Sequence, residues 1–279
     1  MATVLNGIDV SQFQGNIDWN KVKASGNTFV MIRMGWTYYE GGLHIEAMFE
    51  KNIAGATAAG LDVGIYVYGY DQSAAAAKIS AQKVLEAVKK YKLTYPIAYD
   101  IEDQRNFSYG KALNTAIAKA FCETIEAAKY YALVYTYTAF SVSYLNLQDL
   151  KQFDFWVADY RTKALLDSQF KLPYGMWQYI GDAGKVDGVP NSCDRNYAYR
   201  DYAATIKSNN LNHLTDSAPG QPVQETDDVA ALKAQIASLK EEIVVLNKNI
   251  ETAAAESSAF EKTIKAYEEK FQQIKTIVG

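Results

Sequence analysis

The chain has 279 residues, 49% of them hydrophobic and 22% charged, a composition typical of globular proteins with one large or two smaller domains. Its formal charge of −4 comes from residues 215–279, which hold 7 basic and 11 acidic residues, against 21 of each in the first 214. A neutral main domain offers no basic field for nucleic acid, and no apolar run is long enough to span a membrane.

The N-terminal residues 1–10 lack the charged and apolar parts of a secretory signal, so we expect a protein without one. The two cysteines, Cys122 and Cys193, and the two histidines, His44 and His213, show no metal-ligand spacing. We therefore expect two thiols rather than a disulfide, and neither a metal nor a cofactor.

Strand-like apolar runs alternate with helical patterns through residues 1–212. The predicted strands are Val4–Val10, Thr28–Met34, Val63–Tyr70, Pro96–Ile101, Ala132–Thr138, Phe155–Tyr160, Tyr174–Ile180 and Gly184–Val189. Helices are predicted between the earlier strands, at Trp19–Ala24, Ile45–Ala59, Ala74–Tyr91 and Tyr109–Tyr130. Several strands are apolar on both faces, which favours an α/β, TIM-like barrel with five βα units and three further strands. A doubly wound open sheet is the alternative.

Residues 213–228, rich in Pro, Gly and acidic side chains, predict a linker. A heptad pattern follows in residues 229–279, with one seam of Val229, Ile236, Ile243, Ile250, Ser257, Ile264, Phe271 and Val278 and another of Leu232, Leu239, Leu246, Ala253, Phe260, Tyr267 and Ile274. This pattern predicts an α-helical coiled coil that joins two chains as a homodimer. The early Ile/Leu pairs favour two parallel strands, but the charge pairs beside the seams are mixed, with Asp228–Lys233 attractive and Glu256–Glu261 repulsive, which leaves the orientation open. The seam is weakest at Ala253 and Ser257, so a helical hairpin is the alternative.

Two acids end one apolar strand, at Asp100 and Glu102. Residues two apart on a strand point to the same face, roughly 6.5–7 Å apart. At the carboxyl rim of a barrel they would share a pocket, as the two carboxyls of glycoside hydrolysis do. The same spacing also occurs at ordinary solvated strand ends.

Asp9 ends the first predicted strand, and Asp194 follows the last. The first and last strands of a closed barrel are neighbours, so we expect these two acids to approach each other, although each could simply cap a turn. Arg33, at the end of the second predicted strand, either contacts substrate or, as we favour, pairs with a cleft acid. Cys193 has no plausible histidine partner, which argues against a catalytic cysteine.

Six short motifs occur in order, at Gly7–Ser11, Gly64–Tyr68, Asp100–Glu102, Trp156–Tyr160, Trp177–Tyr179 and Asp194–Asn196. Together, over roughly residues 4–206, they resemble the family 25 glycoside hydrolases, lysozymes that act as N-acetylmuramidases. The resemblance implies a barrel of five βα units and three further strands. It also implies cleavage of the β-1,4 bond between N-acetylmuramic acid and N-acetylglucosamine in bacterial peptidoglycan.

The resemblance also assigns roles to residues. Glu102 would be the general acid, Asp100 would stabilise the transition state with help from the substrate N-acetyl group, and Asp9 and Asp194 would set the charge of the cleft. The residues expected to line the cleft are Tyr66, Tyr68, Tyr135, Trp156 and Trp177. This chain has Tyr68-Gly-Tyr70 where many relatives have His or Phe, which leaves the sugar contacts open. The spacing of the two acids leaves the stereochemical outcome open as well.

Two functions follow as hypotheses: an active muramidase, resembling a phage endolysin, or an inactive module that binds the cell wall. An endolysin would stay in the host cytoplasm until lysis and then act on the wall; secretion by another route is the alternative. For residues 229–279 we expect homodimer formation, which would join two catalytic domains on the wall. The alternative is a monomeric segment that binds the wall itself.

Overall fold

The computed structural model describes residues 4–161, 170, 172–215, 235, 238, 261–270, 272–273 and 275. The chain divides into two compact units, Met1–Asp216 and Ser217–Gly279. In the second unit, residues 261–270 are helical and solvent-exposed. Most of the predicted linker and coiled coil lies outside the described residues, so both stay predictions. Among the described helices, none combines the length and the apolar character that a membrane span requires.

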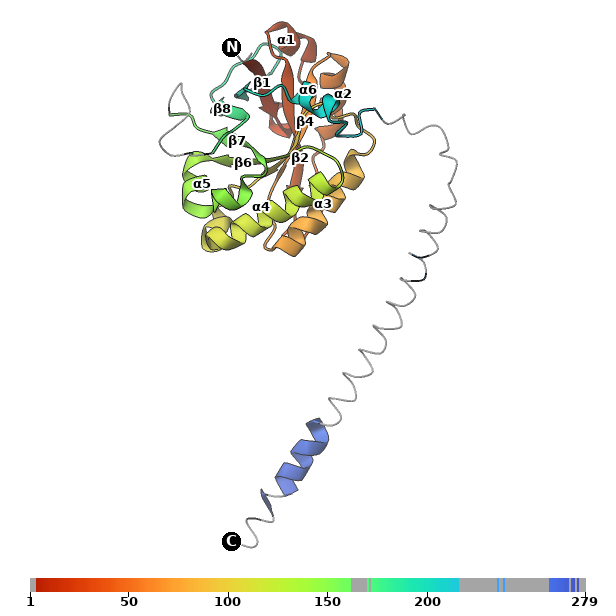
Figure 1. Cartoon of the computed structure of the whole chain (residues 1–279), viewed down its shortest axis with the longest axis vertical. Helices are drawn as coiled ribbons and strands as arrows, with labels where there is room; N and C mark the ends of the chain where they lie inside the picture. The colour runs from red at the N-terminus through yellow and green to blue at the C-terminus, as the bar shows by residue number, and fades with distance from the viewer. Residues whose placement is uncertain are drawn as a thin grey trace. The chain divides into compact units, whose positions relative to one another are not determined.

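The first unit is a barrel with helices around it (Figure 1). Its strands are β1 Leu5–Val10, β2 Phe29–Thr37, β3 Leu43–Ile45, β4 Asp62–Tyr68, β5 Ile97–Asp100, β6 Ala132–Tyr137, β7 Asp154–Ala158, β8 Met176–Ile180 and β9 Asp194–Ala198. Its α-helices within the described residues are α1 Trp19–Ala24, α2 Phe49–Ala58, α3 Ala74–Val88, α4 Gly110–Ala127, α5 Thr138–Tyr144 and α6 Tyr202–Ser208.

The sheet closes through pairing of β1 with both β2 and β9. Neighbouring strands are parallel from β1 through β2, β4, β5, β6 and β7 to β8, whereas β9 is antiparallel to β8 and β1. The short strand β3 pairs only with β2, as an antiparallel extension. This arrangement confirms the predicted barrel of five βα units and three further strands, with β3 added, and rejects the open sheet.

Alternation along the strands divides the core into two clusters. In β2, Phe29 and Met31 point into the barrel, where they join Leu133, Trp156 and residues of other strands. Val30 and Ile32 point outward and pack with residues of the surrounding helices. Because both faces of the parallel strands are covered, these strands are apolar throughout, which explains the runs seen in the sequence.

One predicted strand is wrong. Residues 184–189 contain turns rather than a strand, with Gly188 at a φ of +93°, and Val186 and Val189 pack against the core from a loop. The closing strand is Asp194–Ala198 instead. Its inward side chains are polar because Asp194 lies at the barrel mouth and Asn196 hydrogen-bonds Asp9, so the segment lacks the apolar pattern used for the prediction. The helix predicted from Ile45 starts at Phe49 because Leu43–Ile45 pairs with β2.

Candidate active site

Strand ends gather the acidic side chains at one mouth of the barrel. Asp100 is the last residue of β5, and Glu102 continues the same face two residues later. β9 runs antiparallel to its neighbours, so it starts at the rim where the parallel strands end. Its first residue, Asp194, is therefore the register partner of Asp9 in β1. The predicted approach of Asp9 and Asp194 across the seam is confirmed.

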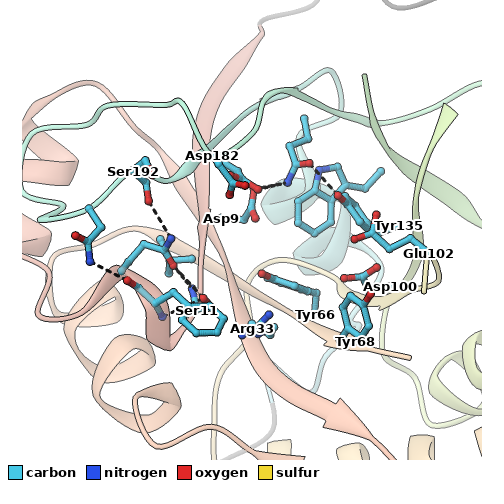
Figure 2. A pocket seen from close by; sticks show the side chains of 17 residues that line it. Asp9, Ser11, Arg33, Tyr66, Tyr68, Asp100, Glu102, Tyr135, Asp182 and Ser192 are labelled. Atoms are coloured by element: carbon cyan, nitrogen blue, oxygen red, sulfur yellow. Dashed lines mark hydrogen bonds between the residues drawn. The ribbon is translucent and has the colours of Figure 1, made fainter. Parts of the chain in front are cut away.

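A cavity of about 340 Å³ opens at this mouth. Nine of the ten predicted site residues line it: Asp9, Arg33, Tyr66, Tyr68, Asp100, Glu102, Tyr135, Trp156 and Asp194. Figure 2 shows Ser11 and Ser192 at one end, Tyr68, Asp100 and Glu102 at the other, and Asp9 and Arg33 between them. The acids thus face a common space rather than bulk solvent, as the two-residue spacing predicted.

A second cavity, of about 480 Å³, adjoins the first. The two share Glu102, Tyr135, Asp182 and Asp194. Its other walls come from the segments that follow β6 and β7, including Tyr137, Thr138, Tyr160 and Arg161. Glu102 therefore lies at the border of two neighbouring spaces, each of which is large enough for a sugar ring.

Gln178, in β8, connects four of the surrounding side chains. Its amide nitrogen donates to Asp9 Oδ2 at 2.9 Å and to Asp194 Oδ2 at 3.1 Å. Its amide oxygen accepts from the Tyr135 hydroxyl at 2.9 Å and the Tyr160 hydroxyl at 2.6 Å. In this orientation the amide oxygen faces the two hydroxyls and the NH2 group faces the two carboxyls, so every polar atom of the Gln178 amide has a partner.

Asn196, in β9, supports Asp9 from the neighbouring strand. Its Nδ2 donates to Asp9 Oδ2 at 2.8 Å, and its Oδ1 accepts from Trp156 Nε1 at 2.8 Å. Asp9 is only 5% exposed, and burial raises its pKa to about 6 despite the hydrogen bonds from Asn196 and Gln178, which lower it. The network therefore holds one carboxyl oxygen of Asp9 in place without removing the cost of its burial.

The other three acids are perturbed in the same direction. Burial, with Asp9 and Asp103 nearby, raises the pKa of Glu102 to about 7. Burial, with Asp9 and Asp182 nearby, raises the pKa of Asp194 to about 8. Burial and the neighbouring Glu102 raise the pKa of Asp100 well above its ordinary value, while Arg33 opposes the shift. Close carboxyls in a poorly solvated cleft cannot all be charged, so the cluster retains protons near neutral pH.

Arg33 pairs with an acid, but not with one of the predicted cleft acids. Its Nε forms an ion pair with Glu46, whose side chain is buried, and the Glu46 Oε2 accepts from the backbone N–H of Gln12 at 2.8 Å. β2 also continues past Arg33 to Thr37, with a register shift between Arg33 and Gly35. The prediction that Arg33 pairs with a cleft acid is therefore wrong about the partner.

Trp177 does not line either cavity, which corrects its prediction as a cleft residue. It lies on the outward face of β8, where it packs beside Tyr179 and Tyr197 and its Nε1 donates to the Asp159 carbonyl at 3.0 Å. The inward residue of the same motif is Gln178. Strand alternation alone decides this difference, because adjacent residues point to opposite faces.

Several lining residues were missed in the sequence: Ser11, Phe13, Gln14, Gln178, Asp182, Asn191 and Ser192. Asn196, which supports Asp9 and Trp156 from behind, was missed as well. A signal existed for Gln178 and Asn196, which are amides inside the motifs Trp177–Tyr179 and Asp194–Asn196. No local signal marks Asn191 and Ser192, which reach the site through a loop.

A sequence model of glycosyl hydrolases family 25 matches residues 8–189. The autolytic lysozyme of Clostridium acetobutylicum is 28% identical over 193 residues, which cover 68% of this chain and 54% of that protein. The chain thus spans about half the length of that relative. The solved autolysin LytC of Streptococcus pneumoniae, in complex with a synthetic peptidoglycan ligand, has a TM-score of 0.61 and 26% identity, covering 70% of this chain and 46% of LytC. A bacterial lysozyme from Streptomyces coelicolor has a TM-score of 0.60 and 22% identity, and the match covers 77% of this chain and 98% of that lysozyme.

Proposed function

The chain belongs to the family 25 glycosyl hydrolases, and on that premise we propose that its acidic mouth is the active site of a lysozyme. The proposed reaction is hydrolysis of the β-1,4 bond between N-acetylmuramic acid and N-acetylglucosamine in bacterial peptidoglycan. The relatives named as an autolytic lysozyme and as an autolysin with a peptidoglycan ligand support this choice of substrate.

The position of Glu102 between the two cavities carries the proposal. A glycan strand that fills both cavities crosses from one to the other beside Glu102, Asp194 and Tyr135. A general acid must lie within reach of the oxygen that joins two sugars. A carboxyl at the border of two sugar-sized spaces meets this requirement, whereas a carboxyl at the bottom of a single pocket does not.

In the proposed mechanism, Glu102 gives its proton to the glycosidic oxygen as the bond from that oxygen to the anomeric carbon breaks. Its pKa of about 7 keeps the proton available near neutral pH. In this proposal Glu102 holds the proton of the two neighbouring carboxyls, so Asp100, buried in the wall of the first cavity, is the anion that offsets the positive charge developing at the anomeric carbon. The substrate N-acetyl oxygen assists. Water adds to the anomeric carbon and returns a proton to Glu102. Asp9 and Asp194, held by Gln178, set the charge of the cleft.

The test is digestion of purified Gram-positive cell walls by the full chain, followed by measurement of new reducing ends and new amino termini. We expect reducing ends to appear, and Glu102→Gln to lower the rate by about 10²–10⁴-fold, as loss of a general acid does. The matched control is Glu86→Gln, an exposed glutamate of α3, which should keep full activity.

Release of amino termini alone would point instead to an amidase or peptidase. Wall binding without any turnover between pH 4 and pH 8 would support an inactive binding module. The endolysin role, with the protein in the host cytoplasm until lysis, is part of the same proposal and rests on the resemblance in sequence.

For residues 229–279 we propose pairing of two chains through the heptad seams, which would let two barrels engage one wall. Sedimentation of the full chain and of residues 1–215 tests this directly. We expect a dimer for the full chain and a monomer for the shorter one. A monomeric full chain would end the assembly proposal and leave wall binding as the role of the segment.

A further inference from the structure

Phe13 is an exposed aromatic residue in the wall of the first cavity. Its side chain is 67% exposed, although it contributes to the lining of that cavity. Single exposed apolar side chains are common on protein surfaces and need no function. The surroundings of Phe13 are therefore what distinguish it from other exposed aromatic residues.

The backbone of Phe13 is held from one side by its own turn. Residues Gln12–Gln14 form a short 3-10 turn that Ser11 caps: the Ser11 hydroxyl accepts from the Phe13 N–H at 3.2 Å, and Gln14 Oε1 accepts from the Ser11 N–H at 2.7 Å. Glu46 accepts from the Gln12 N–H at 2.8 Å. Each residue of the turn is thus tied by a side chain, which restricts the conformations that Phe13 can adopt.

The turn is also tied across the cleft to the loop that precedes β9. Asn191 Nδ2 donates to the Phe13 carbonyl at 2.9 Å, and Gln14 Nε2 donates to the Ser192 carbonyl at 2.9 Å. These contacts join segments 178 residues apart. The Phe13 backbone is thus fixed before a ligand binds, so little backbone entropy is lost when the ring makes its contact.

Arg33 completes the surroundings of the ring. Its guanidinium carbon lies 5.0 Å from the centre of the Phe13 ring, and its Nε is engaged by Glu46. Within the described part of the chain, its two Nη groups have no hydrogen-bond partner, and Arg33 lines the cavity. The guanidinium thus lies over one face of the ring, while most of Phe13 stays exposed to solvent. The remaining face is suited to the C–H face of a pyranose, and the unengaged N–H donors of Arg33 are suited to oxygen acceptors within the cavity.

We propose that Phe13 is a stacking platform for an N-acetylated sugar of the glycan strand away from the bond that is cut, with Arg33 packed on the other face of the ring and donating to oxygens of the strand within the cavity. Ser11 and Ser192, which flank the Phe13 turn, lie at the end of the cavity opposite Glu102 (Figure 2). The platform rests on the proposed function. It adds affinity for long strands and takes no part in proton transfer.

The experiment uses the full chain with Glu102→Gln, so that the ligand is not consumed. Calorimetry measures binding of a linear octasaccharide of alternating N-acetylglucosamine and N-acetylmuramic acid. We expect Phe13→Ala to weaken binding by about tenfold, a size typical of one lost aromatic contact. Phe13→Trp, which keeps a flat ring, should stay within twofold of the parent, and so should Phe107→Ala, a 40% exposed phenylalanine outside both cavities.

Binding by Phe13→Ala within twofold of the parent would overturn the platform, as would a loss that Phe13→Trp does not restore. The melting temperature of Phe13→Ala should match that of the parent because the ring is mostly exposed.

In the active chain, the same substitution should raise KM on long strands and leave kcat unchanged, as loss of uniform binding does. Wall digestion by the wild-type chain tests the proposed function separately. If the wild-type chain bound the octasaccharide without cleaving it, the stacking role of Phe13 would stand and the proposed lysozyme activity would be wrong.

Discussion

Asp100 and Asp154 are inward-facing aspartates at opposite ends of one barrel. Asp154, the first residue of β7, accepts through Oδ2 from Arg200 Nε at 2.7 Å, from the Tyr202 hydroxyl at 3.0 Å and from the Tyr131 hydroxyl at 3.4 Å. Asp100, the last residue of β5, is 3% exposed, and its Oδ1 is buried with no hydrogen-bond partner among the described residues. One carboxyl is surrounded by donors, and the other lies among further carboxyls.

Asn212, at the end of the barrel where Asp154 lies, also has a hydrogen-bond partner for each polar atom of its side chain. It is 1% exposed, and its Nδ2 donates to the carbonyls of Leu93 and Tyr95 at 2.9 and 3.0 Å. Its Oδ1 accepts from the Tyr131 N–H at 2.8 Å. Buried polar groups with all partners present stabilise a fold, whereas those without partners cost free energy. The comparison indicates that Asp154 and Asn212 stabilise the fold, whereas Asp100 retains a cost of burial, as residues at functional sites often do.

The sharpest test of this contrast is Asp100→Asn, which keeps the volume and removes the charge. We expect the rate of wall digestion to fall by about 10²–10³-fold, because an anion near the developing positive charge is lost. We expect the melting temperature to rise by roughly 2–4 °C at neutral pH, because the substitution removes a carboxyl whose burial beside other carboxyls, as an anion or with a bound proton, costs free energy. Reducing-end release and a thermal melt measure the two effects on the same sample.

A loss of both activity and stability in Asp100→Asn would contradict the contrast, since it would show that the Asp100 carboxylate also supports the fold. Asp187→Asn, at an exposed aspartate outside both cavities, serves as the control and should change neither measurement.

Asp154→Asn should have the opposite profile. The amide cannot accept from Arg200 and two tyrosine hydroxyls as a carboxylate does, and the Tyr202 hydroxyl is left buried with a weaker partner. We expect a loss of about 2–3 kcal/mol in the free energy of unfolding, measured by urea titration. Activity at 20 °C should stay within twofold of the wild-type value. If stability were unchanged while activity fell more than tenfold, the division of roles between the two ends would be wrong.

The acidic end of the barrel was largely predictable from the sequence because its geometry follows from the strand period and from closure. Asp100 and Glu102 share a face because they are two residues apart, and Asp9 meets Asp194 because the first and last strands pair. The strand that carries Asp194 was misplaced, since its inward residues are polar and mimic a loop. Trp177 was misassigned because the phase of β8 is not visible in a motif where every residue is large.

The Asp154 end and the Phe13 turn were not predictable, for a different reason. The partners of Asn212 lie 81 to 119 residues away, and those of the Phe13 turn lie 178 residues away. A polar residue in a short segment such as Asn209–His213 reads as a turn until the barrel brings its partners together. Local pattern therefore predicts which strands end in acids, and tertiary contact decides which polar residues are satisfied.

A further expected effect is a pH dependence of stability that arises at the acidic end. Asp9, Glu102 and Asp194 have pKa values of about 6, 7 and 8 in the folded chain, all above the ordinary values of 3.8 to 4.5. The native state therefore binds more protons than the unfolded state between about pH 4 and pH 8, so stability must fall as the pH rises through this range. We expect the melting temperature to drop steadily from pH 5 to pH 8 at constant ionic strength. Asp194→Asn should make the melting temperature depend less on pH. Asp154→Asn should lower the melting temperature at every pH and leave its pH dependence unchanged. A melting temperature that rises toward pH 8, or a slope that Asp194→Asn leaves unchanged, would show that the acids at this mouth are not held in their protonated forms by the fold.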